Sequence, residues 1–333
     1  MTTRLYRFDN IKFLLIVLVV FAHFIETIDS GKLSELYLVI YTFHMPAFIF
    51  LTGFFSKFGL KKIIQDFFLP YLVFQTLYQI FNAVVLCRTH DFTLQYTTPY
   101  WIMWYLMVSA MYHLILPLIE TNSKRNRLLI FASSVVISLA VGYDDTVGYY
   151  LSLSRFFNFM PYFIAGHYAK GYFAEDSCSK RELPCVIRAI IILFAVLLTL
   201  LLLRVLGVNR MMLYGSFSYY RSSSSPAIKM LLLVIGFAWC MILPLIIPEK
   251  KIPAVSAIGA NTLPVYLLHG FVVKLVQSSG IFSASSFVGL SLAVLLTLLV
   301  IALFGNSPFS RFFSYVFNFR WLDALFFPKR ETQ

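Results

Sequence analysis

Two histidines and one glutamate near the start of the chain have side chains suited to general acid–base chemistry. His23 and Glu26 are three residues apart, a spacing that puts both on one face of a helix. His44 follows in the next apolar stretch. An imidazole titrates near neutral pH, and a nearby carboxylate can orient it and raise its basicity. We predict that these three residues are catalytic; the alternative is that each histidine only bonds a neighbouring helix.

The elements that must position these side chains are membrane spans. Of the 333 residues, 59% are apolar and 13% charged, and the mean hydropathy is +0.79. A soluble protein has roughly 45–50% apolar and about 25% charged residues. At about 20 residues per span, the sequence predicts an all-α integral membrane protein, a bundle of about ten transmembrane helices. The predicted spans are Ile11–Ile28, 36–55, 67–86, 100–119, 128–143, 156–170, 186–206, 227–247, 262–280 and 286–305.

Counting residues along the spans gives the depth of each histidine. At 1.5 Å per residue in a core about 30 Å thick, His23 and His44 both lie about 12 Å from the outer surface. The same count places His113 and His269 in the inner half of the bundle, where they line a cytosol-facing cavity or serve the structure. Ionisable side chains at membrane depth are costly and are therefore functional candidates.

Lysine and arginine residues are unevenly divided between the two sides. With the N-terminus inside, the cytosolic segments hold 19 and the opposite loops hold 6. This asymmetry predicts a multi-pass protein of the cell membrane with both termini cytosolic. It also accounts for most of the net charge of +12 without nucleic-acid binding. We divide the chain into a transmembrane domain, 1–307, and a tail, 308–333, that lies along the cytosolic interface.

The four cysteines are too scattered for a disulfide framework or a zinc site. The charge count places Cys87 outside, Cys178 and Cys185 inside, and Cys240 within the membrane. No metal-binding motif, phosphate-binding loop or hydrolase serine motif is present in the sequence. We therefore expect no metal.

Several motifs in order along the chain form a recognisable pattern. Asp9-Asn-Ile-Lys12, ten residues and then His23 resemble the opening of the membrane-bound acyltransferase 3 family. The Phe-rich segment Phe43–Phe54 is similar to the family's second span, with Thr52 in place of a serine. Ser154–Gly166 resembles the fucose 4-O-acetylase-like branch, and Tyr266-Leu-Leu-His269 completes the pattern.

The resemblance implies transfer of an acyl group, usually acetyl from cytosolic acetyl-CoA as co-substrate, to a carbohydrate hydroxyl outside or at the membrane. A sugar hydroxyl is a poor nucleophile at neutral pH, so its attack on a thioester needs a base. We assign that role to His23, with Glu26 as its orienting partner and His44 as a second base or oxyanion stabiliser. Some family members carry an extracytoplasmic hydrolase-like domain. We expect this chain to act without one, or to pass the acetyl group to a separate protein.

Binding residues follow from the same interpretation. The anionic end of CoA is expected near basic residues of the cytosolic side: Lys12, Lys57, Lys61, Lys62, Lys124, Arg125 and Arg127. Lys12 stands where many members have arginine, and it keeps the charge but not the bidentate fork. Trp101, Trp104 and Tyr105 form an aromatic belt or stack on a sugar ring. Arg155 binds the saccharide or an anionic linkage in it, or anchors its helix at the headgroups.

Two other classes of protein share some of these features. A transporter or flippase for a lipid-linked saccharide or small organic solute would also have many spans and buried histidines. Such proteins often contain two related halves with broken helices, which this sequence does not show. A glycan polymerase would more typically have a large extracytoplasmic loop. The acyltransferase is therefore the preferred prediction, with an extracytoplasmic carbohydrate acceptor.

Overall fold

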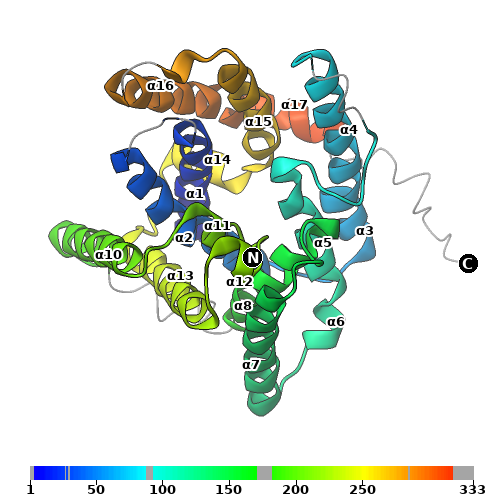
Figure 1. Ribbon diagram of the computed structural model, residues 1–333, viewed down its shortest axis with the longest axis vertical. Helices are drawn as coiled ribbons and strands as arrows, with labels where there is room; N and C mark the ends of the chain where they lie inside the picture. The colour runs from blue at the N-terminus through cyan, green and yellow to red at the C-terminus, as the bar shows by residue number, and fades with distance from the viewer. Residues whose placement is uncertain are drawn as a thin grey trace, which may run out of the picture.

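The protein is described here by a computed structural model, which covers residues 4–26, 28, 31–87, 93–170, 182–283 and 286–317. Within these ranges all regular secondary structure is helical and no strand occurs (Figure 1). The all-α prediction is therefore confirmed for this part of the chain. Cys178 and the tail beyond residue 317 lie outside it.

The helices follow one another in this order: α1 (Tyr6–Ile25), α2 (Gly31–Phe54), α3 (Leu60–Lys62), the π-helical η1 (Ile63–Phe68), α4 (Leu69–Val84), the 3₁₀ turn η3 (Trp101–Met103), α5 (Trp104–Leu114), α6 (Leu116–Ile119), α7 (Lys124–Ala140), η4 (Val141–Tyr143), η5 (Tyr150–Ser152), α8 (Leu153–Tyr168), α10 (Cys185–Val205), α11 (Arg210–Tyr214), α12 (Tyr219–Ser222), α13 (Pro226–Ile246), α14 (Pro253–Ala260), α15 (Leu263–Ser278), η6 (Ile281–Ser283), α16 (Ser286–Gly305) and α17 (Ser307–Phe317).

Local sequence explains where several helices begin. Ser123 and Ser225 accept hydrogen bonds from the backbone N–H groups three residues ahead and so cap α7 and α13. Proline occupies the first turn of α13 and α14, where its missing N–H costs no helical hydrogen bond. The capping serines and the prolines therefore mark where these apolar helices begin. The length of a membrane-spanning helix is set by the thickness of the hydrocarbon core.

The helices support a multi-span membrane protein. Among the described residues, seven helices are long and apolar enough to cross a membrane, or eight if α14 and α15 form one span bent by 85°. Each of the ten predicted stretches overlaps a helix, but α5 has 11 residues and α8 has 16, and neither qualifies alone. Ten spans and cytosolic termini remain predictions. We call the face on which α1 begins and α2 ends the inner face, and the opposite one the outer face.

Helices α2 and α8 approach each other unusually closely. A Cβ atom on Gly53 would lie 2.0 Å from the carbonyl oxygen of Phe163, and one on Gly166 would lie 1.9 Å from that of Phe50. No side chain fits at these distances, so only glycine permits the contact. Small residues at such crossings are typical of helix pairs in membranes, where close backbone packing replaces the hydrophobic driving force.

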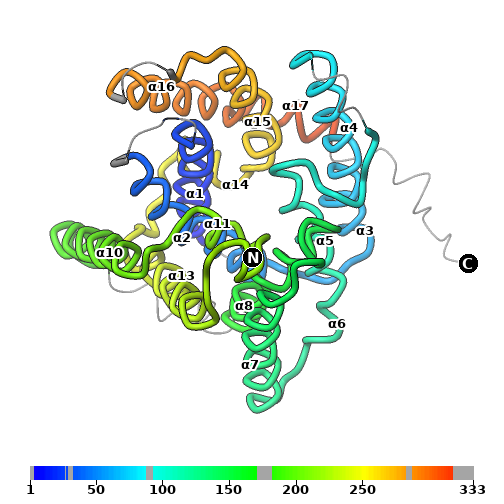
Figure 2. Tube along the Cα trace, in the orientation of Figure 1, coloured from blue at the N-terminus to red at the C-terminus, as the bar shows by residue number. Residues whose placement is uncertain are grey.

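Helix α1 lies among helices from both ends of the chain. It packs against α2 and against α14, α15 and α16, and in Figure 2 the blue α1 lies beside the yellow α14 and the orange α15 and α16. Gly259 of α14 allows this approach, because a Cβ there would lie 1.8 Å from the carbonyl oxygen of Asp9. The helix that carries His23 is thus enclosed by late parts of the sequence.

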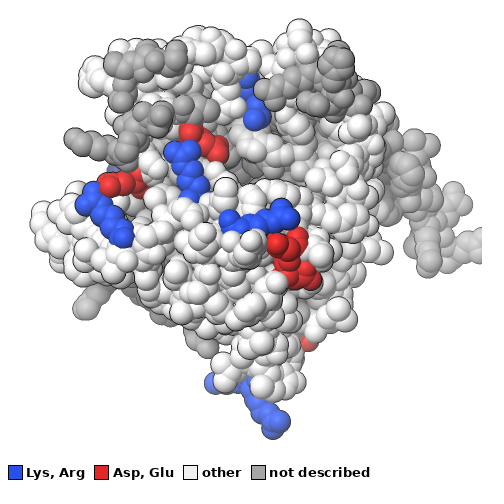
Figure 3. All heavy atoms as spheres, in the orientation of Figure 1, with Lys and Arg blue, Asp and Glu red and all other residues white. Residues whose placement is uncertain are grey.

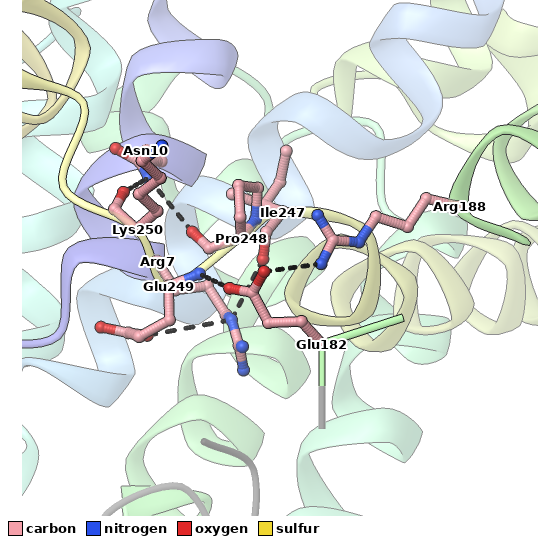
Figure 4. A network of polar contacts seen from close by, with 8 residues as sticks. All are labelled: Arg7, Asn10, Glu182, Arg188, Ile247, Pro248, Glu249 and Lys250. Atoms are coloured by element: carbon pink, nitrogen blue, oxygen red, sulfur yellow. Dashed lines mark hydrogen bonds and ion pairs between the residues drawn. The ribbon is translucent and has the colours of Figure 1, made fainter. Parts of the chain in front are cut away.

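A polar network fastens the inner end of α1 to the segment before α14 (Figure 4). Arg7 Nε donates to the carbonyl oxygen of Ile247 at 3.1 Å, and Asn10 Nδ2 donates to that of Lys250 at 3.0 Å. The carboxylate of Glu182 accepts from the backbone N–H of Glu249 at 3.0 Å. Because buried polar groups are costly unless bonded, these contacts fix the position of α1 along its own axis.

The face in Figure 3 shows few charges amid a large uncharged surface, and most of them lie beside a side chain of opposite sign. On the outer face, Arg204 pairs with Glu35 at 2.7 Å and Arg221 pairs with Asp145 at 3.3 Å. Both pairs are partly exposed to solvent.

Cysteine labelling tests the predicted orientation. Cys87 and Cys185 are exposed, and Cys240 is buried. In intact cells, a membrane-impermeant maleimide is expected to label Cys87 alone, while Cys178 and Cys185 react only after permeabilisation. A Cys87→Ala variant provides the control, since it should remain unlabelled in sealed cells. If that variant were labelled before permeabilisation, the predicted orientation or the predicted number of spans would be wrong.

Candidate active site

His23 lies where two cavities meet. The inner cavity, of about 290 Å³, extends towards the inner face and is lined mainly by apolar side chains together with Asp66 and Tyr105. The outer cavity, of about 210 Å³, is lined by Glu26, His44 and Arg155 among others. Four residues border both cavities: His23, Met45, Ile102 and Trp104. The His23 side chain can therefore meet molecules that enter from opposite sides.

The imidazole of His23 is held by polar and aromatic neighbours. Its Nδ1 lies 3.5 Å from Glu26 Oε2 and 3.3 Å from the hydroxyl of Tyr41. The ring of Trp101 stands edge-on at 4.7 Å between centroids, and that of His269 stacks at 5.5 Å. Because a carboxylate only accepts hydrogen bonds, Glu26 favours a proton on Nδ1. That tautomer leaves the Nε2 lone pair as the basic site.

Glu26 is itself positioned by two tyrosines. The hydroxyl groups of Tyr37 and Tyr214 donate to Oε1 at 3.2 and 3.0 Å. Arg210 donates to the Glu26 backbone carbonyl at 3.1 Å. Burial and the nearby Glu26 charge raise the pKa of Tyr214 to about 12. Tyr214 therefore stays protonated at neutral pH and remains a donor to the carboxylate.

His44 lies on the wall of the outer cavity. Its Nδ1 contacts the carbonyl oxygen of Ile40 at 2.8 Å, and its ring is 4.6 Å from that of Tyr41. A carbonyl partner requires the proton on Nδ1, so Nε2 is again the acceptor. The structure thus brings His23, Glu26 and His44 to one cavity, where Tyr41 lies between the two imidazoles.

The predicted acceptor residues divide between the cavities. Trp101 and Arg155 line the outer cavity, and Trp104 borders both. Tyr105 instead lines the inner cavity, where its hydroxyl lies 2.7 Å from that of Thr52. The three aromatic residues therefore do not form one stacking surface. The ring of Tyr105 meets that of Trp104 edge-on at 6.2 Å between centroids, on the side of the inner cavity.

The predicted CoA-binding residues do not line the inner cavity. Lys12 pairs with Asp9 at 2.9 Å, the local ion pair that a spacing of three residues favours. Arg127 donates to the Thr121 carbonyl at 2.9 Å and lies over the ring of Tyr168. The remaining residues are exposed or half-buried side chains near the inner ends of α3 and α7: Lys57, Lys61, Lys62, Lys124 and Arg125. Among the described residues, no group of three His, Cys, Asp or Glu could hold a metal ion.

The placement of His269 corrects the depth count. The sequence places it in the inner half, but its ring stacks on His23 and is fully buried. The count assumed a straight span that starts near residue 262. In the structure α14 precedes α15 at an angle of 85°, so α15 begins already inside the bundle. His269 Nδ1 contacts the Val265 carbonyl at 3.0 Å, and Nε2 has no hydrogen-bond partner in the described protein.

Sequence reasoning also missed the tyrosines around the site. Tyr37 and Tyr41 precede His44 by seven and three residues, a helical spacing that could have placed them on its face. Tyr149 and Tyr214 arrive from distant segments, and nothing in their local sequence points to the site. The missed residues supply most of the hydroxyl groups near Glu26.

A family model described as an acyltransferase domain, Acyl_transf_3, matches residues 5–306. Searches of curated proteins and of solved structures found no significant match. The match covers nearly the whole chain, including every residue that borders the two cavities. The chain therefore belongs to the acyltransferase 3 family.

Proposed function

We propose that this membrane acyltransferase moves an acetyl group from cytosolic acetyl-CoA to a hydroxyl of a cell-surface or exported polysaccharide, or of its lipid-linked precursor. The observation that carries the proposal is the position of His23 between two cavities. An apolar cavity directed to the inner face suits a pantetheine arm and thioester. A smaller cavity with carboxylate, imidazole and arginine groups suits a polar acceptor. The protein acts in the cell membrane.

The chemistry proposed for His23 is general base catalysis. Nε2 takes the proton of the acceptor hydroxyl as its oxygen attacks the thioester carbonyl. The tetrahedral intermediate then collapses, the C–S bond breaks and the CoA sulfur takes up the proton. Glu26 holds Nδ1 and stabilises the imidazolium that forms between these steps. His44 faces the same cavity and is a candidate for stabilising the oxyanion.

An assay with purified protein in proteoliposomes tests the reaction. Radiolabelled acetyl-CoA is supplied on one side, and surface polysaccharide from the source cells on the other. Label in the polysaccharide that alkaline treatment releases is the expected result, because esters are base-labile. Solute or lipid-linked saccharide movement without acetylation would instead identify a transporter or flippase.

Charge reversal at Lys61 and Lys62 tests the donor side. Both follow the inner end of α2, close to η1, whose Asp66 and Phe67 line the inner cavity. We expect Lys61→Glu with Lys62→Glu to raise the KM for acetyl-CoA about tenfold, since exposed ion pairs contribute up to about 1 kcal/mol each. Lys250→Glu with Lys251→Glu is the matched control on the same face. Equal KM values for the two double variants would show that Lys61 and Lys62 do not bind acetyl-CoA and only help to set the orientation of the protein in the membrane.

A further inference from the structure

Arg155 is a cation on the wall of the outer cavity. Its Nε donates to the Tyr214 carbonyl at 3.1 Å, and its Nη2 donates to Ser216 Oγ at 3.4 Å. The guanidinium carbon lies 5.0 Å from the ring centroid of Trp104 and 5.3 Å from that of Tyr149. Aromatic faces and neutral acceptors orient the group but leave its charge uncompensated.

Among the described residues, the carboxylates of the outer face contact groups other than Arg155. Glu35 pairs with Arg204, and Asp145 pairs with Arg221. Glu26, the carboxylate that lines the outer cavity, is bound by His23, Tyr37 and Tyr214. Among the described residues, no carboxylate lies within 4 Å of the Arg155 guanidinium, and no described group accepts a hydrogen bond from its Nη1.

An uncompensated guanidinium in a cavity is costly unless the ligand supplies the opposite charge. Arg210 donates to the backbone carbonyl of Glu26, a residue that lines the same cavity, and lies over the ring of Tyr37. Arg155 therefore places a fixed positive charge on the wall of the outer cavity. A planar fork with free N–H groups matches the geometry of carboxylate and phosphate oxygens.

We propose that the acceptor is an acidic saccharide, whose carboxylate or phosphodiester group binds Arg155 while a hydroxyl close to it faces His23. This inference rests on the proposed acetyl transfer and narrows its substrate class. Because one cavity of about 210 Å³ contains both side chains, the anionic group belongs to the acetylated sugar or to its immediate neighbour. The charged group positions the acceptor and takes no part in the transfer of the proton.

Binding is measured by tryptophan fluorescence, since Trp101 and Trp104 border the cavity. The probes are a glucuronate-containing disaccharide, a glucosyl phosphodiester and the neutral disaccharide cellobiose, titrated into purified protein in phosphatidylcholine nanodiscs. We expect at least one anionic probe to bind about 10–100-fold more tightly than the neutral one, the range for charge-assisted hydrogen bonds. The stronger of the two anionic probes identifies the group.

Variants separate recognition from structural support. Arg155→Gln is expected to remove the preference for the anionic probe, and Arg155→Lys to keep part of it, because lysine retains the charge. Arg204→Gln, a change at a paired arginine outside the cavity, should bind like the wild type. Thermal unfolding of each variant is recorded alongside, and unchanged midpoints with a lost preference support recognition.

Three results would overturn the inference. They are equal affinity for neutral and anionic probes, a preference that persists in Arg155→Gln, and a fluorescence change on titration with short-chain phosphatidylglycerol when neither sugar probe binds, which would assign Arg155 to a lipid headgroup. The titration needs no turnover. A failed acetylation assay therefore leaves its result intact, and a missing charge preference leaves the acetyl transfer intact.

Discussion

His23→Ala is expected to insert and fold normally, to bind acetyl-CoA, and to lose about 10²–10⁴-fold of its acetyl-transfer rate, the usual effect of removing a general base. The fold should survive because Glu26 keeps its hydrogen bonds from Tyr37 and Tyr214 when the imidazole is gone. Initial rates of label transfer at saturating acetyl-CoA provide the measurement, with protein amounts matched by fluorescence size-exclusion chromatography.

His23→Gln separates catalysis from packing. Glutamine retains a polar group that can contact Glu26 and Tyr41, but it cannot accept the proton at neutral pH. It is therefore expected to be as inactive as alanine. If a well-expressed His23→Gln enzyme retains more than about a tenth of the rate, His23 is not the base, and His44, on the same cavity wall, becomes the first alternative.

Gly166→Ala is expected to cause a large loss of folded protein. Its Cβ would lie 1.9 Å from the Phe50 carbonyl oxygen, so α2 and α8 would have to move apart by more than a typical core can absorb. Overpacking ordinarily costs about 1–3 kcal/mol, and here the obstacle is rigid backbone. The readout is the monodisperse fraction after extraction into detergent.

Gly59→Ala is the matched control for that variant. A Cβ at Gly59 meets only the Cβ of Lys62, at 3.8 Å, and the backbone there is extended with φ of 175°. It should yield as much folded protein as the wild type. Should Gly166→Ala yield as much as Gly59→Ala, the spacing of α2 and α8 would be adjustable and the close approach incidental.

The fold was largely predictable because membrane spans obey a simple rule of length and polarity. Each expected stretch contains a helix, and the Asp9–Lys12 spacing gave the observed ion pair. The hydropathy of a segment, however, does not give the direction in which its helix runs. The chain bends between Ala260 and Leu263, which join two apolar helices. Only the packed structure shows that this bend places His269 at the depth of His23.

The site could be predicted where its residues lie close together in the sequence. His23 and Glu26 share a helix turn, so their proximity follows from helical geometry. The partners of Glu26 come from α2 and α11, and Tyr149 comes from the segment before α8. Contacts between residues so distant in sequence depend on how helices pack, which no local pattern encodes. The roles of these residues remain predictions.

The enclosure of α1 by α14, α15 and α16 has a consequence for biogenesis. A ribosome delivers α1 to the membrane first and α14, α15 and α16 last, so most of the chain is synthesised before these three neighbours arrive. During that interval His23 and Glu26 face lipid, translocon or chaperone. Contacts at long sequence separation form slowly, and exposed intermediates are open to degradation. We therefore expect chains that end before α14 to be degraded, because they have every predicted catalytic side chain but no enclosed site.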